Sequence, residues 1–285
     1  MKKLMLILAM AFFMVGMVAC DRIEEPYFKE NNEDSEHLPL SDEDISNWQN
    51  KKVVLLEDFT GVKCVNCPQA AVLAHELQHQ YEHQLVVLGV HASSGDAYTS
   101  PVGGFPDFRT EEGTEWYAHF NFAANPIGTI NRQNNCYGYL SSQWADVVSE
   151  TVNGEPNIRL LSAVKYNESD RELKVSVYSK FLEEFSDKYS LTVCIMEDSI
   201  VGKQIGQGED YVHRHVFRKC MNGTWGAELN TEVIAPQEEI IKSYSLTLDE
   251  AYNADQCYII AYVANSETKE ILQVTEKKIK EVIGF

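Results

Sequence analysis

Two cysteines separated by two residues, Cys64 and Cys67, are the side chains best placed to do chemistry. They follow an apolar run and open a predicted helix. At such a position, unpaired backbone N–H groups and the positive end of the helix dipole stabilise a thiolate. The second cysteine lies one turn further on, close enough to attack a mixed disulfide and release the product. The pattern therefore indicates thiol–disulfide exchange, with Cys64 as the nucleophile and Cys67 as the resolving thiol.

Two other uses of a Cys-x-x-Cys motif have to be weighed. A zinc ribbon requires a second such motif, and the sequence contains none. A purely structural disulfide stays open, because the chain is predicted to be exported to a compartment where disulfides persist. We expect no metal and no cofactor at this site.

The elements around the two cysteines alternate between strand and helix. The continuous apolar run from Val53 to Leu56 is typical of a central strand that is buried on both faces. The pattern then predicts a helix over 64–81, a strand over 85–91, a long loop over 92–112, a helix over 112–122, a strand over 127–131 and a helix over 140–152. Residues 51–154 therefore form a small predicted α/β domain.

Residues 155–285 change class, because short runs rich in Val, Ile and Tyr alternate with turn residues. Seven such runs fit an all-β immunoglobulin-like sandwich domain. The predicted strands cover 158–166, 173–181, 191–196, 211–219, 240–246, 258–264 and 271–275.

The N-terminal fifty residues have a different character. Lys2 and Lys3 precede an apolar run that ends at Ala19, which predicts a signal peptide over residues 1–19. This run is shorter than the ~20 residues that a membrane helix needs. Its end resembles a bacterial lipobox, which implies that Cys20 carries a lipid that attaches the protein to a membrane. Residues 20–50 are rich in acids and are expected to form a flexible tether.

Composition limits the partners. The 285 residues are 44% hydrophobic and 24% charged, as in folded globular proteins. The formal net charge of -19 repels phosphate backbones, so we expect no nucleic-acid partner. The sequence does not indicate an oligomeric state.

The stretch from Glu57 to Cys67 resembles the strand–turn–helix active site of the thioredoxin superfamily. Asp58 occupies the position of the buried carboxylate that accepts a proton from the second cysteine in that superfamily. Pro126 resembles the cis-proline that lies beside the disulfide and lines the substrate groove. The sequence departs from the usual pattern because Lys63 replaces a tryptophan and Val65-Asn66 replaces Gly-Pro.

The whole layout is similar to a narrower family, named after a twenty-eight-kilodalton outer-membrane lipoprotein of Gram-negative anaerobes. The similarity rests on the lipobox, the acidic tether, the block over 59–68 and the Tyr-Val-His-Arg-His-Val-Phe-Arg segment over 211–218. It implies a lipid-anchored outer-membrane protein that faces the periplasm or the cell surface. Two functions stay open: thiol–disulfide exchange on the thiols or disulfides of envelope proteins, and non-enzymatic surface binding or assembly through the sandwich with a structural disulfide.

The remaining cysteines and the histidines give weaker signals. The pairing of Cys136, Cys194, Cys220 and Cys257 is open, with a Cys194–Cys257 disulfide as one hypothesis. Histidines at helical spacing are expected on a solvated helix face, namely His75, His79 and His83. His213 and His215 are expected at the surface of one strand. His91 either lines the substrate groove or caps its strand.

Overall fold

The computed structural model describes residues 29–30, 37–46 and 50–280. The predicted signal peptide, the lipidation site at Cys20 and much of the acidic tether lie outside the described residues. Within the described part of the chain, no helix has both the length and the apolar character needed to cross a membrane.

The N-terminal half, residues 50–154, contains a mixed sheet. Strands β2 (Val54–Thr60) and β3 (Leu85–His91) run parallel, and β4 (Ile127–Ile130) pairs antiparallel with the other edge of β2. Every residue of β2 and β3 is buried. The continuous apolar runs of the sequence are therefore central strands covered on both faces, as predicted.

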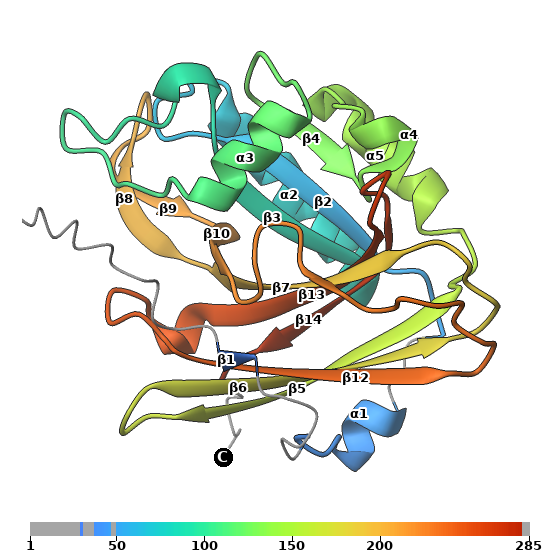
Figure 1. The fold of residues 1–285 in the computed structure, drawn as a ribbon. Helices are drawn as coiled ribbons and strands as arrows, with labels where there is room; N and C mark the ends of the chain where they lie inside the picture. Colours follow the sequence, from blue (N-terminus) through green and yellow to red (C-terminus); the bar gives the residue numbers. More distant parts are fainter. Residues whose placement is uncertain (1–28, 31–36, 47–49, 281–285) are drawn as a thin grey trace, which may run out of the picture.

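Helices cover both faces of this sheet (Figure 1). Helix α2 (Cys67–Tyr81) and helix α5 (Ser141–Thr151) pack on one face, where Trp144 is fully buried. Helix α3 (Glu111–His119) packs on the other face through Trp116, which is also fully buried. The loop between β3 and α3 contains a short 3-10 turn, Ser94–Asp96.

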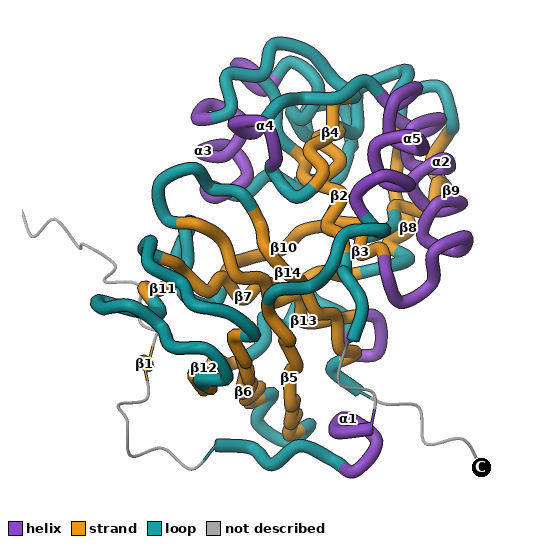
Figure 2. The backbone as a smooth tube through the Cα atoms, turned by 90° about the vertical axis from the view of Figure 1, so that its right-hand side faces the viewer, coloured by secondary structure: helices purple, strands orange, loops and turns teal. Residues whose placement is uncertain are grey.

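The C-terminal half, residues 155–280, consists mainly of two layers of strands (Figure 2). One sheet has the order β1-β12-β6-β5, and the facing layer contains β7, β13 and β14. An apolar core fills the space between the two layers. The strand bounds are β1 (Lys29–Glu30), β5 (Ile158–Asn167), β6 (Glu172–Phe181), β7 (Tyr189–Glu197), β12 (Glu239–Thr247), β13 (Cys257–Asn265) and β14 (Ile271–Lys278).

The two halves share one eight-stranded sheet, in the order β14-β13-β7-β10-β3-β2-β4, with β11 (Ala227–Glu228) paired to β7. Strand β10 (Val216–Cys220) joins them, because it runs antiparallel to β7 on one side and meets β3 in parallel at Gly89 on the other. The sequence pattern does not predict this continuity, since its strands were divided between two domains at residue 154.

The predicted strand over 211–219 is wrong in one respect, because the structure breaks it into two strands. Strand β9 (Gly208–His213) pairs with β8 (Ile200–Gln204) in a separate hairpin, and β10 begins at Val216. Between them, His215 has a φ of 55°, in the left-handed region that strands do not use. The Asp198 carboxylate accepts the backbone N–H of His215 at 3.0 Å and holds this bend.

Part of the predicted tether lies against the C-terminal half. Residues 37–46, which include helix α1 (Asp42–Ser46), contact β6 and β14. The backbone N–H of Leu38 donates to the Ser176 hydroxyl at 2.9 Å, and Asp44 forms an ion pair with Lys277 at 2.8 Å. The described end of this acidic segment is therefore docked on the sandwich.

Candidate functional site

The two cysteines of the motif form a disulfide in the turn between β2 and α2. Helix α2 begins at Cys67, not at Cys64 as the sequence pattern predicts. The reason is local: the backbone N–H of Cys64 donates to the Gly61 carbonyl at 3.0 Å and closes a turn before the helix starts. Cys67 thus lies in the first helical turn, and Cys64 faces it from the preceding loop.

The N-terminus of α2 suits a thiolate. The first turn reads Cys-Pro-Gln-Ala, which brings no acidic side chain to the positive end of the helix dipole. The side chain of Asn66, the N-cap residue, makes no capping hydrogen bond to the backbone of this turn. The N–H groups of this turn are therefore open to negative charge on a nearby sulfur, and Pro68 lacks an N–H that would need a partner.

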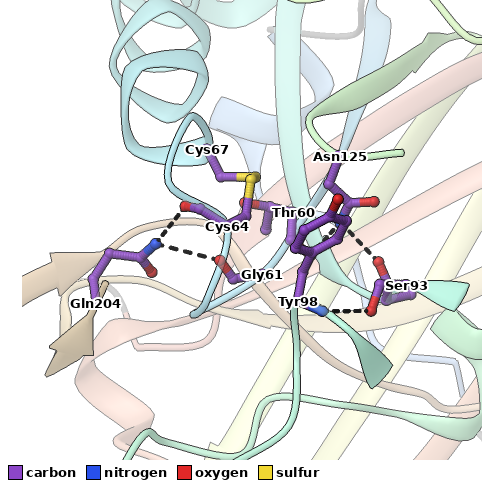
Figure 3. Close-up of a disulfide and its surroundings, with 9 residues drawn as sticks. Thr60, Gly61, Cys64, Cys67, Ser93, Tyr98, Asn125 and Gln204 are labelled. Atoms are coloured by element: carbon purple, nitrogen blue, oxygen red, sulfur yellow. Dashed lines mark hydrogen bonds between the residues drawn. A yellow bond between two sulfur atoms is a disulfide. The ribbon is translucent and has the colours of Figure 1, made fainter. Parts of the chain in front are cut away.

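Two segments far away in the sequence hold the turn in place (Figure 3). Gln204, at the end of β8, donates its amide N–H groups to the carbonyl oxygens of Cys64 at 3.0 Å and Gly61 at 3.3 Å. On the other side, the carbonyl oxygen of Tyr98 accepts the backbone N–H of Lys63 at 2.8 Å. Gln204 is not predictable from the sequence, because no local pattern links it to a turn about 140 residues earlier.

Gly61 is required where the turn meets the loop that carries Tyr98. A Cβ at Gly61 would lie 2.4 Å from the Tyr98 carbonyl oxygen, which is backbone and cannot rotate away. We expect Gly61→Ala to separate the two segments and to lower the free energy of unfolding by about 1–3 kcal/mol. Urea denaturation measures this loss. Gly154→Ala, where the nearest contact is 3.3 Å, is the control and should lose less; equal losses would contradict the argument.

Asp58 lies behind the disulfide, where the sequence resemblance places it. Its side chain is buried, and its Oδ1 has no hydrogen-bond partner among the described residues. Burial raises the pKa of this carboxyl from 3.8 to about 7. Asp58 and Cys67 line the same small cavity of about 30 Å³, which is room for about one or two water molecules. The carboxyl group of Asp58 and the second cysteine of the motif therefore border one water-sized space.

Histidines line the same cavity, and here the sequence expectation is wrong. His213 and His215 are not surface residues: they are only 4% and 7% exposed, because the bend between β9 and β10 turns both toward the N-terminal half. His91 joins them, with its ring centroid 5.9 Å from that of His213. Burial lowers the pKa of His91 to about 3 and the pKa values of His213 and His215 to about 4. All three rings are therefore neutral at pH 7 and bring no positive charge to Asp58.

The helix histidines follow the prediction more closely. His79 and His83 are exposed. His75 is half-buried, with its ring centroid 5.7 Å from that of His215. Among the described residues, no three or more His, Cys, Asp or Glu side chains are arranged so that they could hold a metal ion.

Asn125 fixes the segment that carries Pro126. Its amide donates to the carbonyl oxygens of Thr60 at 2.8 Å and Ala92 at 2.9 Å, at the ends of β2 and β3. The peptide bond between Asn125 and Pro126 is cis. Figure 3 shows Asn125 next to Thr60, at the end of β2 that leads into the disulfide turn. Pro126 is thereby held at the strand ends that also carry the cysteine turn.

The turn covers the disulfide almost completely. Cys64 and Cys67 are each 2% exposed, whereas Val65 between them is 66% exposed. The Lys63 ammonium lies 5.2 Å from the centre of the Phe105 ring. A partner that meets this surface therefore encounters Val65 before it reaches a sulfur atom.

A second buried carboxylate, Glu57, lies next to Asp58 but points to the other face of β2, as alternate residues of a strand do. The Arg132 guanidinium binds both of its oxygens, at 2.8 and 2.5 Å, and the Thr129 hydroxyl donates to one of them at 2.6 Å. Arg132 also donates to the Tyr262 hydroxyl of β13 at 3.0 Å. This network connects the two halves. Among the described residues Asp58 has no such ion pair, although Arg214 lines the same cavity.

The other described cysteines are all thiols, and the hypothesis of a Cys194–Cys257 disulfide is wrong. Cys257 is opposite Glu197 and faces the core between the two sandwich layers, whereas Cys194 faces the core beneath α3. The neighbour of Cys194 is Cys220. Burial raises the pKa of Cys136 to about 11 and that of Cys257 to about 12, so neither thiol is a nucleophile near neutral pH.

Comparison with protein-family models identifies the family of this chain. The family model described as "Outer membrane protein Omp28" matches residues 114–282, more than half of the chain. The chain belongs to the Omp28 family. Its members are outer-membrane proteins, which locates this protein at the outer membrane, as the sequence predicts. The matched residues begin after the Cys64–Cys67 turn, so membership alone does not bear on the chemistry of the disulfide.

Two solved structures have a similar fold over most of this chain. HBP35 of Porphyromonas gingivalis is similar with a TM-score of 0.63 at 16% identity, over 84% of this chain and 81% of that chain. A protein from Agrobacterium tumefaciens has a TM-score of 0.55 at 13% identity, over 83% of this chain and 99% of its own. A domain of the outer membrane lipoprotein Omp28 from Porphyromonas gingivalis has a TM-score of 0.32 at 23% identity, over 44% and 89% of the two chains. A search of curated proteins gave no match.

Proposed function

We propose that this Omp28-family protein carries out thiol–disulfide exchange on envelope proteins through Cys64 and Cys67. The observation that carries the proposal is the position of the pair: a disulfide at the open N-terminus of α2, with a buried and unpaired carboxylate in the cavity behind it. We further propose that residues 51–154 are a thioredoxin-like domain and residues 155–285 an immunoglobulin-like sandwich. The order β2-α2-β3, with α3 and α5 on opposite faces and an antiparallel β4, supports the first assignment.

The reaction moves two electrons. In the reduced protein, the Cys64 thiolate attacks one sulfur of a substrate disulfide; an S–S bond forms to Cys64 and a substrate thiolate leaves. Cys67 then gives its proton to Asp58 and attacks the Cys64 sulfur, which closes the Cys64–Cys67 disulfide and releases the second substrate thiolate. The reverse sequence oxidises a substrate dithiol.

The surroundings assign supporting roles. A carboxyl group with a pKa of about 7 can accept and return a proton near neutral pH, which fits Asp58 as the proton acceptor for Cys67. Pro126 is proposed to line the substrate groove, because the hydrogen bonds of Asn125 hold it at the strand ends beside the disulfide. Cys20 is proposed to carry the lipid that anchors the chain.

One observation favours a second function. Both sulfur atoms are almost completely covered, as in a structural disulfide, and the protein would then act by surface binding or assembly through the sandwich. The two functions differ in the reduction potential of the Cys64–Cys67 couple. A catalytic pair is expected at about -120 to -270 mV and a structural pair below about -300 mV.

Insulin reduction with a dithiol reductant tests the proposal. We expect the wild-type protein to accelerate insulin precipitation and Cys64→Ser to fall to the uncatalysed rate, because the variant lacks the attacking sulfur. Cys136→Ser is the matched control: it removes a buried thiol elsewhere and should keep full activity. Circular dichroism confirms that each variant is folded. Equal rates for the wild type and a folded Cys64→Ser would reject exchange and leave the binding function.

A further inference from the structure

The C-terminal half brings together a second pair of cysteines that no function has yet used. Cys194 in β7 and Cys220 in β10 are directly opposite each other in the antiparallel register. Their Sγ atoms lie 3.4 Å apart, and both side chains are completely buried. We propose that Cys194 and Cys220 form a cross-strand disulfide in the mature protein, in addition to the Cys64–Cys67 bond.

The selectivity of the pairing comes from the fold. Each of these two sulfurs has the other as its hydrogen-bonding neighbour, as a thiol–thiol contact. Cys136 instead contacts the Thr268 carbonyl oxygen at 3.6 Å, and Cys257 is opposite Glu197 in the other core. Among the cysteines that the structure describes as thiols, Cys194 and Cys220 are the pair within reach of a bond.

The location of the protein supplies the chemistry. A chain exported to the outer membrane folds outside the cytosol, where protein thiols are oxidised. The thiolate of one cysteine attacks a sulfur of the disulfide of an oxidising protein, so that a mixed disulfide forms and one thiolate leaves. The thiolate of the other cysteine then attacks the cysteine sulfur of the mixed disulfide, which closes the Cys194–Cys220 bond and releases the second thiolate. The oxidising protein is thereby reduced to a dithiol, and the two protons from Cys194 and Cys220 balance the two that its sulfurs take up. Because the folded sheet covers both sulfurs, this exchange takes place during folding, before β10 closes against β7.

The bond would fasten the strand that joins the two halves. β10 lies between β7 and β3, and the carbonyl oxygen of His215, just before β10, accepts the backbone N–H of Gly89 at 2.7 Å. A covalent bond at Cys220 would attach the C-terminal end of β10 to β7. The histidines of the cavity, His213 and His215, lie just before the N-terminal end of β10. The proposal is independent of any exchange activity at Cys64.

Peptide mapping tests it on the unaltered full-length chain. The protein is isolated from the cell envelope, its thiols are blocked with N-ethylmaleimide in denaturant, and it is digested without reductant. We expect the peptides of Cys194 and Cys220 as one linked species, lighter than their sum by the mass of two hydrogen atoms. Cys136 and Cys257 should be blocked in the same digest and serve as internal controls. Recovery of Cys194 and Cys220 as blocked thiols would overturn the proposal.

A stability measurement checks the same bond separately. In a Cys64→Ser/Cys67→Ser background, adding dithiothreitol should lower the thermal midpoint, because the chain has lost its remaining cross-link. Adding Cys194→Ala and Cys220→Ala together should abolish that response, while Cys257→Ala should leave it intact. A midpoint that does not respond to dithiothreitol in the background protein would contradict the proposal, whatever the result of the insulin assay.

Discussion

Arg132→Met is expected to lower the free energy of unfolding by about 3–5 kcal/mol, because it leaves the fully buried Glu57 carboxylate without its cation. The guanidinium fills more than one role here. It binds both carboxylate oxygens, lies 4.8 Å from the centre of the Trp116 ring and reaches the Tyr262 hydroxyl in the other half. Urea or guanidinium unfolding, followed by tryptophan fluorescence, measures the loss.

Two further variants make this result specific. Arg109 also has two carboxylate partners, but its side chain is 32% exposed, so Arg109→Met should cost about 1 kcal/mol or less. Combining Glu57→Met with Arg132→Met removes both charges and should recover much of the stability, since no buried charge is then left unpaired. If Arg132→Met lowers the free energy of unfolding as little as Arg109→Met does, the prediction is contradicted, because water must then solvate the Glu57 carboxylate in the variant.

Asp58→Asn is expected to gain stability relative to the wild type as the pH rises from about 4 to 8. The pKa of Asp58 is raised from 3.8 to about 7 in the folded protein, by burial. Between these values the folded state holds a proton that the unfolded chain has released, so the wild type loses stability as the pH rises. Asparagine does not titrate. At about 1.4 kcal/mol for each pKa unit, the difference should grow by about 2–4 kcal/mol.

The measurement is a series of urea unfolding curves at several pH values for both proteins. Other buried groups with shifted pKa values, such as Glu276 and the cavity histidines, titrate equally in both proteins and cancel in the difference. Asp210→Asn, which removes an exposed carboxylate from β9, is the control. A flat difference for Asp58→Asn would mean that its carboxyl is solvated in the folded state.

The sequence predicted most elements because their signals are local. The strand over 85–91 has the predicted bounds, and the predicted helix over 140–152 extends one residue beyond α5 at each end. In both, a run or a period of apolar residues is enough to define the element. The start of α2 was wrong by three residues, because a turn hydrogen bond to Gly61 competes with the first helical turn.

The sequence could not predict contacts between the two halves. Gln204 and His213 reach the cysteine turn and its cavity only after the chain has formed the whole sheet, and neither belongs to a motif. The burial of His215 depends on the positive φ of His215 itself. A single residue of this kind produces no periodic pattern in the sequence. The pairing of Cys194 with Cys220 depends on the register of β7 and β10, and alternating apolar residues do not determine which strands are neighbours.

The position of β10 also bears on how such a protein can change during evolution. Its two parts cannot be exchanged as independent modules, because a copy cut at residue 154 would leave the edge of β3 without its neighbour and with exposed backbone groups. A gene fusion that kept the cysteine turn and replaced the rest would have to supply another strand at this place. We therefore expect the part with the disulfide to occur together with a part that completes its sheet.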